Sequence, residues 1–273
     1  MREKTPNLPS TVAAALRKEA PSYVEMGEGG DCATIASYNV HKCVGTDGRF
    51  DPGRTAKVIA ELNADIVALQ EADQRFGERV GLLDLEALAE ATDLVPVHYS
   101  TNARSHGWHG NIILARRSKA HDVHALRLPG LEPRGALIVD LEFEDTPLRI
   151  IASHLGLWRR SRSLQAKVLL AATTGVKRPT ILLGDLNEWR VRTRSSLLEL
   201  MPQFGPLHAV LPSFPSGFPL LALDRILARP PGIIASLEVH QSPLARVASD
   251  HLPIKARLNL KTARQIESKL NVA

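Results

Sequence analysis

The stretch TILLGDLN, residues 180–187, runs from a short apolar segment directly into polar residues. A short apolar run bounded by turn residues is typical of a buried strand, so we expect one at 180–183. Asp185 and Asn187 would then lie at the end of this strand, where the following loop opens to solvent. Polar groups held on a rigid element beside a loop are well placed to bind a metal or a phosphate.

The same arrangement recurs along the chain. Other apolar segments begin or end at Asn39, Glu71, His154, Asp224 and the triplet Ser-Asp-His at 249–251. An Asp, Asn or His beside a strand is commonly a turn residue or a structural hydrogen-bonding group. Six such positions on one chain, however, indicate a shared polar site.

Strand-like and helical segments alternate between residues 31 and 260. Helices are expected at 52–63, where Asp51 can cap the first turn and Pro52 occupies the first position, and at 82–92 and 161–173. Strands are expected at 33–40, 66–69, 95–100, 111–115, 121–126, 136–143, 148–153, 180–183, 225–227, 236–239 and 253–260. Successive antiparallel-type strands with few helices favour an α/β four-layer sandwich, in which two mixed, mainly antiparallel sheets pack face to face with helices outside.

The chain is expected to form one catalytic domain at 31–260. Residues 1–30 form an N-terminal extension in this interpretation, with a short helix at 10–20, and residues 261–273 form a C-terminal tail. The tail has helical composition, with Ile266 and Leu270 four residues apart, and is expected to be a solvated helix.

Composition excludes several classes of protein. With 273 residues, 44% of them hydrophobic, the chain can build a large core and is not disordered. No run approaches the roughly 18–20 apolar residues that a membrane-spanning helix needs. The first residues carry charges of both signs and two prolines, which predicts no cleaved signal peptide. Two cysteines cannot form a disulfide framework, so we expect a reducing, cytoplasmic location.

The positive charge is unevenly distributed. The net charge is +5, yet residues 157–194 carry +7 and residues 255–273 carry +4, so the remainder sums to −6. Only 4% of the residues are aromatic, which is low for a protein that stacks bases on rings. The distribution favours a phosphate-bearing partner without sequence-specific reading of bases, and it implies no stable protein partner.

The carboxylates at the strand ends suit a hard metal ion. Glu71 and Asp250 are oxygen donors of the kind that Mg²⁺ or Mn²⁺ prefers, and Asn39 can add a neutral oxygen or contact a phosphate. His154 and His251 lack the cysteines and spacing of a zinc site.

The two histidines are better suited to donating hydrogen bonds to a phosphoryl oxygen. Asp224 can orient an imidazolium, and Asp185 can orient or deprotonate a water. A metal, acid–base groups and phosphate donors together indicate phosphoester hydrolysis.

Seven segments extend this pattern into a family resemblance. They are SYNVHK (37–42), IVALQEAD (66–73), GNIILARR (110–117), SHLGL (153–157), LLGDLNEW (182–189), LDRIL (223–227) and SDHLPI (249–254). Their order resembles that of the endonuclease/exonuclease/phosphatase superfamily, in particular its compact bacterial members, over residues 33–260. The resemblance implies a two-sheet sandwich with the active site at one edge.

The resemblance also implies a role for each residue. Glu71 looks like the main metal ligand, assisted by Asn39 and Asp250. Asp185 is similar to the residue that positions or activates the attacking water, and Asn187 to the one that contacts the scissile phosphate. His251 resembles the catalytic histidine polarised by Asp224, and His154 the phosphate-binding histidine.

The substrate is the least constrained part of the interpretation. Trp158 and Arg159 follow SHLGL, Trp189 follows GDLNE, and Arg134 begins a predicted strand, so these four are candidate substrate-binding residues. We expect a phosphodiesterase acting on nucleic acid or a phospholipid-type diester. The alternatives are a phosphomonoesterase for an inositol or other small polyphosphate, and a non-catalytic phosphate-binding domain.

Overall fold

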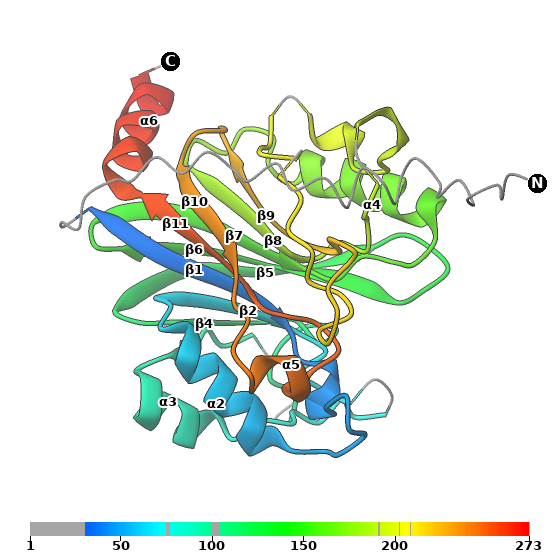
Figure 1. The fold of residues 1–273 in the computed structure, drawn as a ribbon. Helices are drawn as coiled ribbons and strands as arrows, with labels where there is room; N and C mark the ends of the chain where they lie inside the picture. The colour runs from blue at the N-terminus through cyan, green and yellow to red at the C-terminus, as the bar shows by residue number, and fades with distance from the viewer. Residues whose placement is uncertain are drawn as a thin grey trace, which may run out of the picture.

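Two facing β-sheets form the centre of the molecule (Figure 1). The computed structural model describes residues 31–74, 77–99, 104–190, 192–201, 203–207 and 209–272. The six-stranded sheet has the order β10-β11-β1-β2-β4-β3, and the five-stranded sheet has the order β5-β6-β7-β8-β9. Both sheets mix parallel and antiparallel pairs, as the sequence predicts.

The strands have the following bounds. The first sheet contains β1 (Cys32–Asn39), β2 (Ile66–Gln70), β3 (Val95–Pro96), β4 (Ile112–Ala115), β10 (Ile234–Val239) and β11 (Ile254–Asn259). The second contains β5 (Ser118–Leu128), β6 (Arg134–Phe143), β7 (Thr146–Ser153), β8 (Thr180–Asp185) and β9 (Asp224–Arg229).

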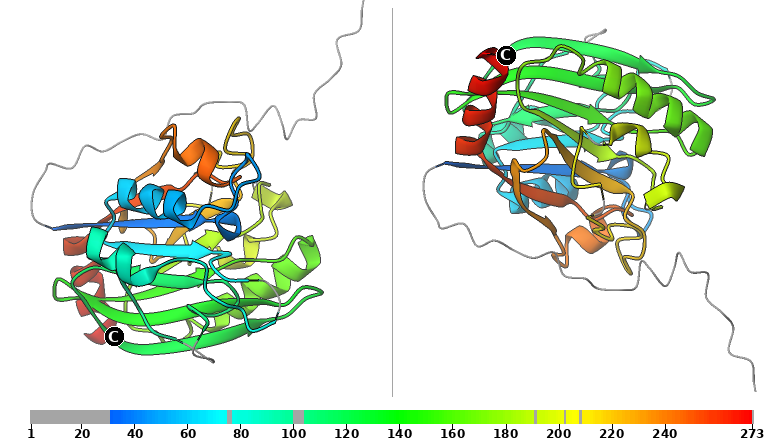
Figure 2. Two further views of the ribbon diagram at one scale, coloured as in Figure 1. Left: turned by 90° about the horizontal axis from the view of Figure 1, so that it is seen from below. Right: turned by 90° about the horizontal axis from the view of Figure 1, so that it is seen from above.

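Helices cover the outer faces of the two sheets, and α6 (Leu260–Val272) packs at one end of the sandwich (Figure 2). The other helices are α2 (Pro52–Leu62), α3 (Leu85–Thr92), α4 (Arg159–Ala171) and α5 (Ala245–Ala248), with short 3-10 turns at η1 (His41–Cys43), η2 (Arg192–Arg194) and η3 (Leu198–Leu200). One apolar cluster fills the space between the sheets, a second joins the first sheet to α2, and a third joins the second sheet to α4. These clusters confirm the predicted sandwich, because apolar sheet faces are buried on both sides.

Most predicted elements lie within a few residues of their expected positions. The Asp51 side chain accepts a hydrogen bond from the Arg54 backbone at 2.8 Å, which confirms the cap of α2. Helix α3 begins at Leu85 rather than at 82, because Asp84 caps it by accepting from the Ala87 backbone at 3.0 Å.

Three parts of the sequence interpretation differ from the structure or lie outside it. The strand expected at 95–100 is only the two-residue β3, and Ser100 lies outside the described residues. The extension at 1–30, with its expected helix at 10–20, also lies outside them. The C-terminal helix was expected to be solvated, yet Leu260 and Ala263 of α6 are fully buried in the core between the sheets.

Parallel pairing brings the polar strand ends together. Strands β1 and β2 run parallel with Asn39 opposite Gln70, and β7 and β8 run parallel, so each pair ends at one edge of its sheet. Strand β9 runs antiparallel to β8, which places its first residue, Asp224, opposite Asp185. The topology therefore gathers the predicted site residues at one edge of the sandwich.

Candidate active site

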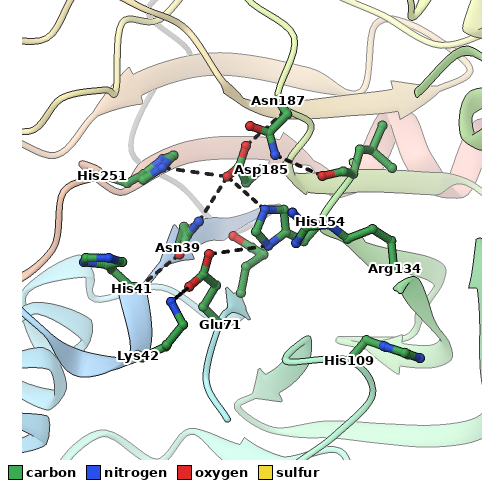
Figure 3. Close-up of polar contacts among 12 residues, drawn as sticks. Asn39, His41, Lys42, Glu71, His109, Arg134, His154, Asp185, Asn187 and His251 are labelled. Carbon is green, nitrogen blue, oxygen red and sulfur yellow. Dashed lines mark hydrogen bonds and ion pairs between the residues drawn. The ribbon is translucent and has the colours of Figure 1, made fainter. Parts of the chain in front are cut away.

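Asp185 lies at the centre of the site and is almost fully buried. Its Oδ2 atom accepts from Asn39 Nδ2 at 3.0 Å and lies 3.3 Å from His154 Nε2 and 3.7 Å from His251 Nε2 (Figure 3). Its Oδ1 accepts from the Asn187 backbone at 3.0 Å. One carboxylate thus brings together three side chains, from the end of β1, from the residue after β7 and from the segment before β11.

His251 is held by a second buried carboxylate. Its Nδ1 lies 2.9 Å from Asp224 Oδ2, which also accepts from Ser213 Oγ at 2.5 Å. Burial lowers the pKa of His251, but the carboxylates of Asp224 and Asp185 outweigh burial and raise this pKa to about 10. The imidazole is therefore positively charged at neutral pH, and its Nε2 faces Asp185.

His154 has the opposite electrostatic character. Its ring is buried, and burial lowers its pKa to about 4 although Asp185 and Glu71 act in the other direction. Its Nδ1 lies 4.0 Å from Glu71 Oε1. A neutral imidazole between two carboxylates can donate one hydrogen bond, which suits it to a phosphoryl oxygen.

Glu71 follows β2 and points toward Lys42 (Figure 3). The Lys42 ammonium donates directly to Glu71 Oε2, and the Lys42 backbone donates to the Glu71 carbonyl at 3.2 Å. Burial raises the pKa of Glu71, but His154 and Lys42 outweigh it and hold this pKa at about 2. The carboxylate is therefore ionised and already attracts a cation.

The backbone around this ion pair is strained. Glu71 has a φ of 55°, and His41, Lys42 and Cys43 have consecutive φ values of 46°, 55° and 59°. Left-handed φ values in non-glycine residues are unfavourable and often occur at functional sites. The Lys42–Glu71 contact therefore joins two strained backbone positions.

The other predicted metal ligands differ in their placement. Asn39 is buried, and its Oδ1 accepts from the His41 backbone at 3.0 Å. Asp250 is more open, with 34% of its side chain exposed, and lies 3.7 Å from His41 Nδ1. Within the described residues, no group of three His, Cys, Asp or Glu side chains converges to form a metal site by itself.

The donors present nevertheless fit a hard cation. Mg²⁺ in proteins is commonly held by one or two carboxylates and keeps several waters, so it does not require a cage of three. Glu71 is ionised, partly exposed and paired with an ammonium group, and Asn39 ends the neighbouring strand. Glu71 is thus the best-placed ligand, with Asn39 beside it.

Asn187 and Arg134 also lie near the centre. Asn187 has a φ of 52° and donates from Nδ2 to the Leu155 carbonyl at 2.9 Å. Arg134 lies at the start of β6 and lines a pocket together with Glu71 and His154. These two predicted positions therefore adjoin the Asp185 cluster.

The remaining substrate-binding candidates do not join this pocket. Trp158 is 63% exposed at the start of α4, next to the exposed Arg159. The Arg190 guanidinium lies over the Trp189 ring, 4.7 Å from its centre. None of Trp158, Arg159 and Trp189 is among the described residues that line the pocket.

Part of the basic segment 157–194 has a structural role. Arg162 is buried, and its Nη2 lies 3.4 Å from Glu188 Oε2. Its Nε donates to Ser196 Oγ at 3.0 Å, and the same Ser196 donates to Glu188. This positive charge therefore stabilises the loop after β8 and is not available to a substrate.

Sequence reasoning missed three residues that shape the site. They are Ser213, which donates to Asp224, and the pocket residues Arg79 and His109. Lys42 belongs to the quoted segment SYNVHK, and its position just after Asn39 makes it a further candidate from sequence, which the structure places in the pocket. Ser213, Arg79 and His109 lie in loops, where no periodicity indicates which way a side chain points.

This geometry defines a class of protein. An ionised carboxylate suited to a hard cation, a buried aspartate surrounded by nitrogen donors, and an aspartate–histidine pair are the parts of a hydrolase that acts on phosphoester bonds. The chain belongs to the endonuclease/exonuclease/phosphatase family, whose model matches residues 36–251. A search of curated proteins found none that matches the chain.

Solved structures confirm the fold at low sequence identity. An endonuclease/exonuclease/phosphatase from Beutenbergia cavernae is 20% identical with a TM-score of 0.65, covering 85% of this chain and 72% of that one. D. rerio TDP2, complexed with single-strand DNA product, is 18% identical with a TM-score of 0.61, covering 84% and 100%. A mannosyl-6-phosphatase from Bacteroides thetaiotaomicron is 19% identical with a TM-score of 0.60, covering 82% and 98%.

Proposed function

We propose that this chain is a Mg²⁺-dependent phosphodiesterase that hydrolyses nucleic-acid or phospholipid-type diesters by in-line attack of water. The observation that supports this most is the set of nitrogen donors around Asp185 Oδ2, contributed by Asn39, His154 and His251. A buried carboxylate at such a centre is placed to accept a proton from water. The same donors can then stabilise charge on a phosphoryl oxygen.

Glu71 would hold the metal, with Asn39 as a neutral oxygen donor and Asp250 as a further carboxylate at the rim. When bound, Mg²⁺, or Mn²⁺ in its place, supplies charge neutralisation on a non-bridging oxygen. His251, kept positive by Asp224, donates to the transferring group. His154 and Asn187 hold the phosphate in position for attack.

The decisive test is Asp185→Asn. We expect Mg²⁺-dependent hydrolysis of bis(p-nitrophenyl) phosphate to fall at least about a hundredfold, because the variant cannot accept a proton. Asp122→Asn serves as a matched control, since Asp122 is an exposed aspartate on β5. Hydrolysis that is unaffected by Asp185→Asn would show the assigned mechanism to be wrong.

A phosphomonoesterase is the second candidate. It is favoured by the cationic side chains of Lys42, Arg79 and Arg134 in the pocket, because a monoester carries more negative charge than a diester. Parallel assays on p-nitrophenyl phosphate, supercoiled plasmid and phospholipid vesicles, each with and without EDTA, separate the candidates. Plasmid nicking that survives EDTA would contradict the metal-dependent mechanism, and inactivity on every ester would favour a binding domain.

None of the described helices combines the length and apolar character needed to cross a bilayer. Cys32 and Cys43 are both free thiols, which supports our proposal of a reducing, cytoplasmic location.

A further inference from the structure

The pocket beside the Asp185 cluster has two walls of different character. Glu71, His154 and Lys42 form its inner wall and belong to the site already described. Arg79, His109 and Arg134 also line the pocket and are defined here as its outer wall. In Figure 3, Arg134 and His109 lie on the side of His154 away from Asp185 and His251. The outer wall is thus next to the place of reaction without being part of it.

The outer wall carries guanidinium groups that neighbouring carboxylates hold in place. Arg134 donates from Nε and Nη2 to Glu132 Oε2 at 3.2 and 2.8 Å, which uses two of its five N–H donors. Arg79 donates from Nε and Nη2 to Asp73 at 2.9 and 3.1 Å. Both side chains are mostly buried, with 14% and 26% exposed. Such pairing fixes each planar group before a ligand arrives.

Each cation of the pocket has a carboxylate partner. Lys42 pairs with Glu71, Arg79 with Asp73 and Arg134 with Glu132. A metal ion held by Glu71, as proposed above, would add positive charge beside the outer wall. The loaded pocket would therefore attract the negatively charged part of a substrate that extends toward Arg134.

His109 is placed in this wall by two close backbone approaches. It has a φ of 49°, and a Cβ on the following Gly110 would lie 3.3 Å from Glu71 Cα. A Cβ on Gly135 would lie 3.0 Å from the His109 ring and 2.4 Å from Trp108 Nε1. The Trp108 ring meets the His109 ring edge-on, with centres 4.7 Å apart. Two glycines and a tryptophan therefore hold the imidazole against β6.

Burial and nearby positive charges determine the protonation state of His109. Burial lowers its pKa, and the guanidinium groups of Arg79, Arg127 and Arg134 lower it further. The ring is consequently neutral at pH 7 and adds no charge to the outer wall.

We propose that the outer wall binds a second phosphate group of the substrate, so that the preferred substrates are esters carrying two phosphates on a short spacer. This inference rests on the proposed function, because it assigns the scissile phosphate to the Asp185 cluster. Guanidinium groups match phosphate oxygens with paired N–H donors, and partial burial strengthens such contacts. The second phosphate would lie between Arg134 and Arg79, with the His109 ring packed beside it.

The test compares a ligand that carries one phosphate with ligands that carry two. Asp185→Asn is used for calorimetry in Mg²⁺ buffer, so that the ligands are not turned over. The probes are propyl phosphate and the bisphosphates of ethane-1,2-diol, propane-1,3-diol and butane-1,4-diol. We expect at least one bisphosphate to bind about tenfold more tightly than propyl phosphate, as for one or two charge-assisted hydrogen bonds.

Variants of the outer wall should remove this gain. In the Asp185→Asn background, adding His109→Asn or Arg134→Gln should reduce the ratio of affinities to less than about threefold. Arg117→Gln is the matched control, because Arg117 is 72% exposed beside Asp65, at the opposite end of β2 from Glu71. A gain that is absent for all three spacers, or that survives both outer-wall variants, would overturn the proposal.

Hydrolysis of bis(p-nitrophenyl) phosphate by the unmodified protein is measured alongside. Hydrolysis without a bisphosphate gain rejects the second-phosphate site and leaves the proposed function standing. A gain that depends on the outer wall, without hydrolysis of any ester, rejects the proposed function and supports the phosphate-binding wall.

Discussion

At the scale of single residues, the site combines a strained backbone with an ion pair between Lys42 and Glu71. Four non-glycine residues, His41, Lys42, Cys43 and Glu71, have left-handed φ values, each of which costs roughly 1 kcal/mol or more. These residues place an ammonium group on the carboxylate that we assign to the metal. Lys42 therefore competes with a divalent cation for Glu71.

Lys42→Met should tighten metal binding. Removing the ammonium leaves Glu71 without its counter-charge, so we expect the Kd for Mg²⁺, measured by calorimetry, to fall about three- to tenfold. Lys255→Met is a suitable control, because Lys255 lies in β11 and pairs with Glu238 at 2.8 Å. An unchanged Kd would show that Lys42 does not occupy the position of the cation.

The contribution of the Asp224–His251 pair to catalysis should depend on the charge of Asp224 rather than on its shape. Asp224→Asn keeps the size of the side chain but removes the negative charge that holds His251 in its protonated form. We expect kcat for bis(p-nitrophenyl) phosphate to fall at least about a hundredfold. Ser213→Ala removes only a hydrogen bond to Asp224 and should cost much less, so equal losses in the two variants would contradict this role for the carboxylate.

The chemical groups of the site were largely predictable at this scale, but their partners were not. Asp185, Asn187, Glu71, His154 and His251 stand beside apolar runs, so their positions are readable from local pattern. Asp250 shows the limit, because the sequence indicates its type and place but not that its side chain faces His41. Side-chain direction beyond a strand end depends on tertiary packing, which local pattern does not encode.

At the scale of elements, one glycine controls how closely two strands approach beside the site. Gly184 in β8 has a φ of 143°, and a Cβ there would lie 1.8 Å from the Ser153 carbonyl oxygen of β7. The next residue in β8 is Asp185, and the next after Ser153 is His154. The close approach therefore places two site residues together.

Gly184→Ala should separate these strands. We expect the free energy of unfolding, measured with urea, to fall by about 2–4 kcal/mol, because backbone must move to admit the methyl group. Hydrolysis should fall with it at temperatures where the variant is still folded. Gly175→Ala is the control for adding a methyl group at a left-handed glycine, since a Cβ there meets nothing within 4 Å. Equal stability of the two variants would contradict the close approach.

Strand and helix positions were predictable where a pattern was continuous. Helix α2 has a capping aspartate, a proline in its first turn and a continuous buried face, and the sequence predicts its start correctly. The docking of α6 was not predictable, because few apolar residues mark its buried face and Leu260 joins the core only through the topology of β11. Local signals fix where a helix lies in the chain more readily than what it packs against.

At the scale of the whole molecule, the site spans both sheets. Asn39 and Glu71 come from the first sheet, and His154, Asp185 and Asp224 come from the second. A ligand at this junction contacts both layers, so binding should stabilise the entire sandwich.

Magnesium should therefore raise the melting temperature. For a Kd of about 1 mM, 10 mM Mg²⁺ adds roughly 1.4 kcal/mol, or about 2–4 °C in Tm for a domain of this size. Glu71→Gln should abolish the increase, and EDTA should reverse it. Differential scanning calorimetry with Ca²⁺-free buffer and a matched NaCl control measures the effect, and a Glu71→Gln protein that still responds would argue for a metal site elsewhere.

Because the site residues come from separate parts of the chain, hydrolysis depends on the assembly of these parts. A cut in the turn at 116–117, between β4 and β5, would leave Asn39 and Glu71 on one fragment and His154, Asp185, Asp224 and His251 on the other. Neither fragment would contain a complete set of reacting groups. Hydrolysis would require the two to reassociate through the core between the sheets and through the pairing of β1 with β11. Activity recovered on mixing the fragments would therefore measure how much of the sandwich has formed.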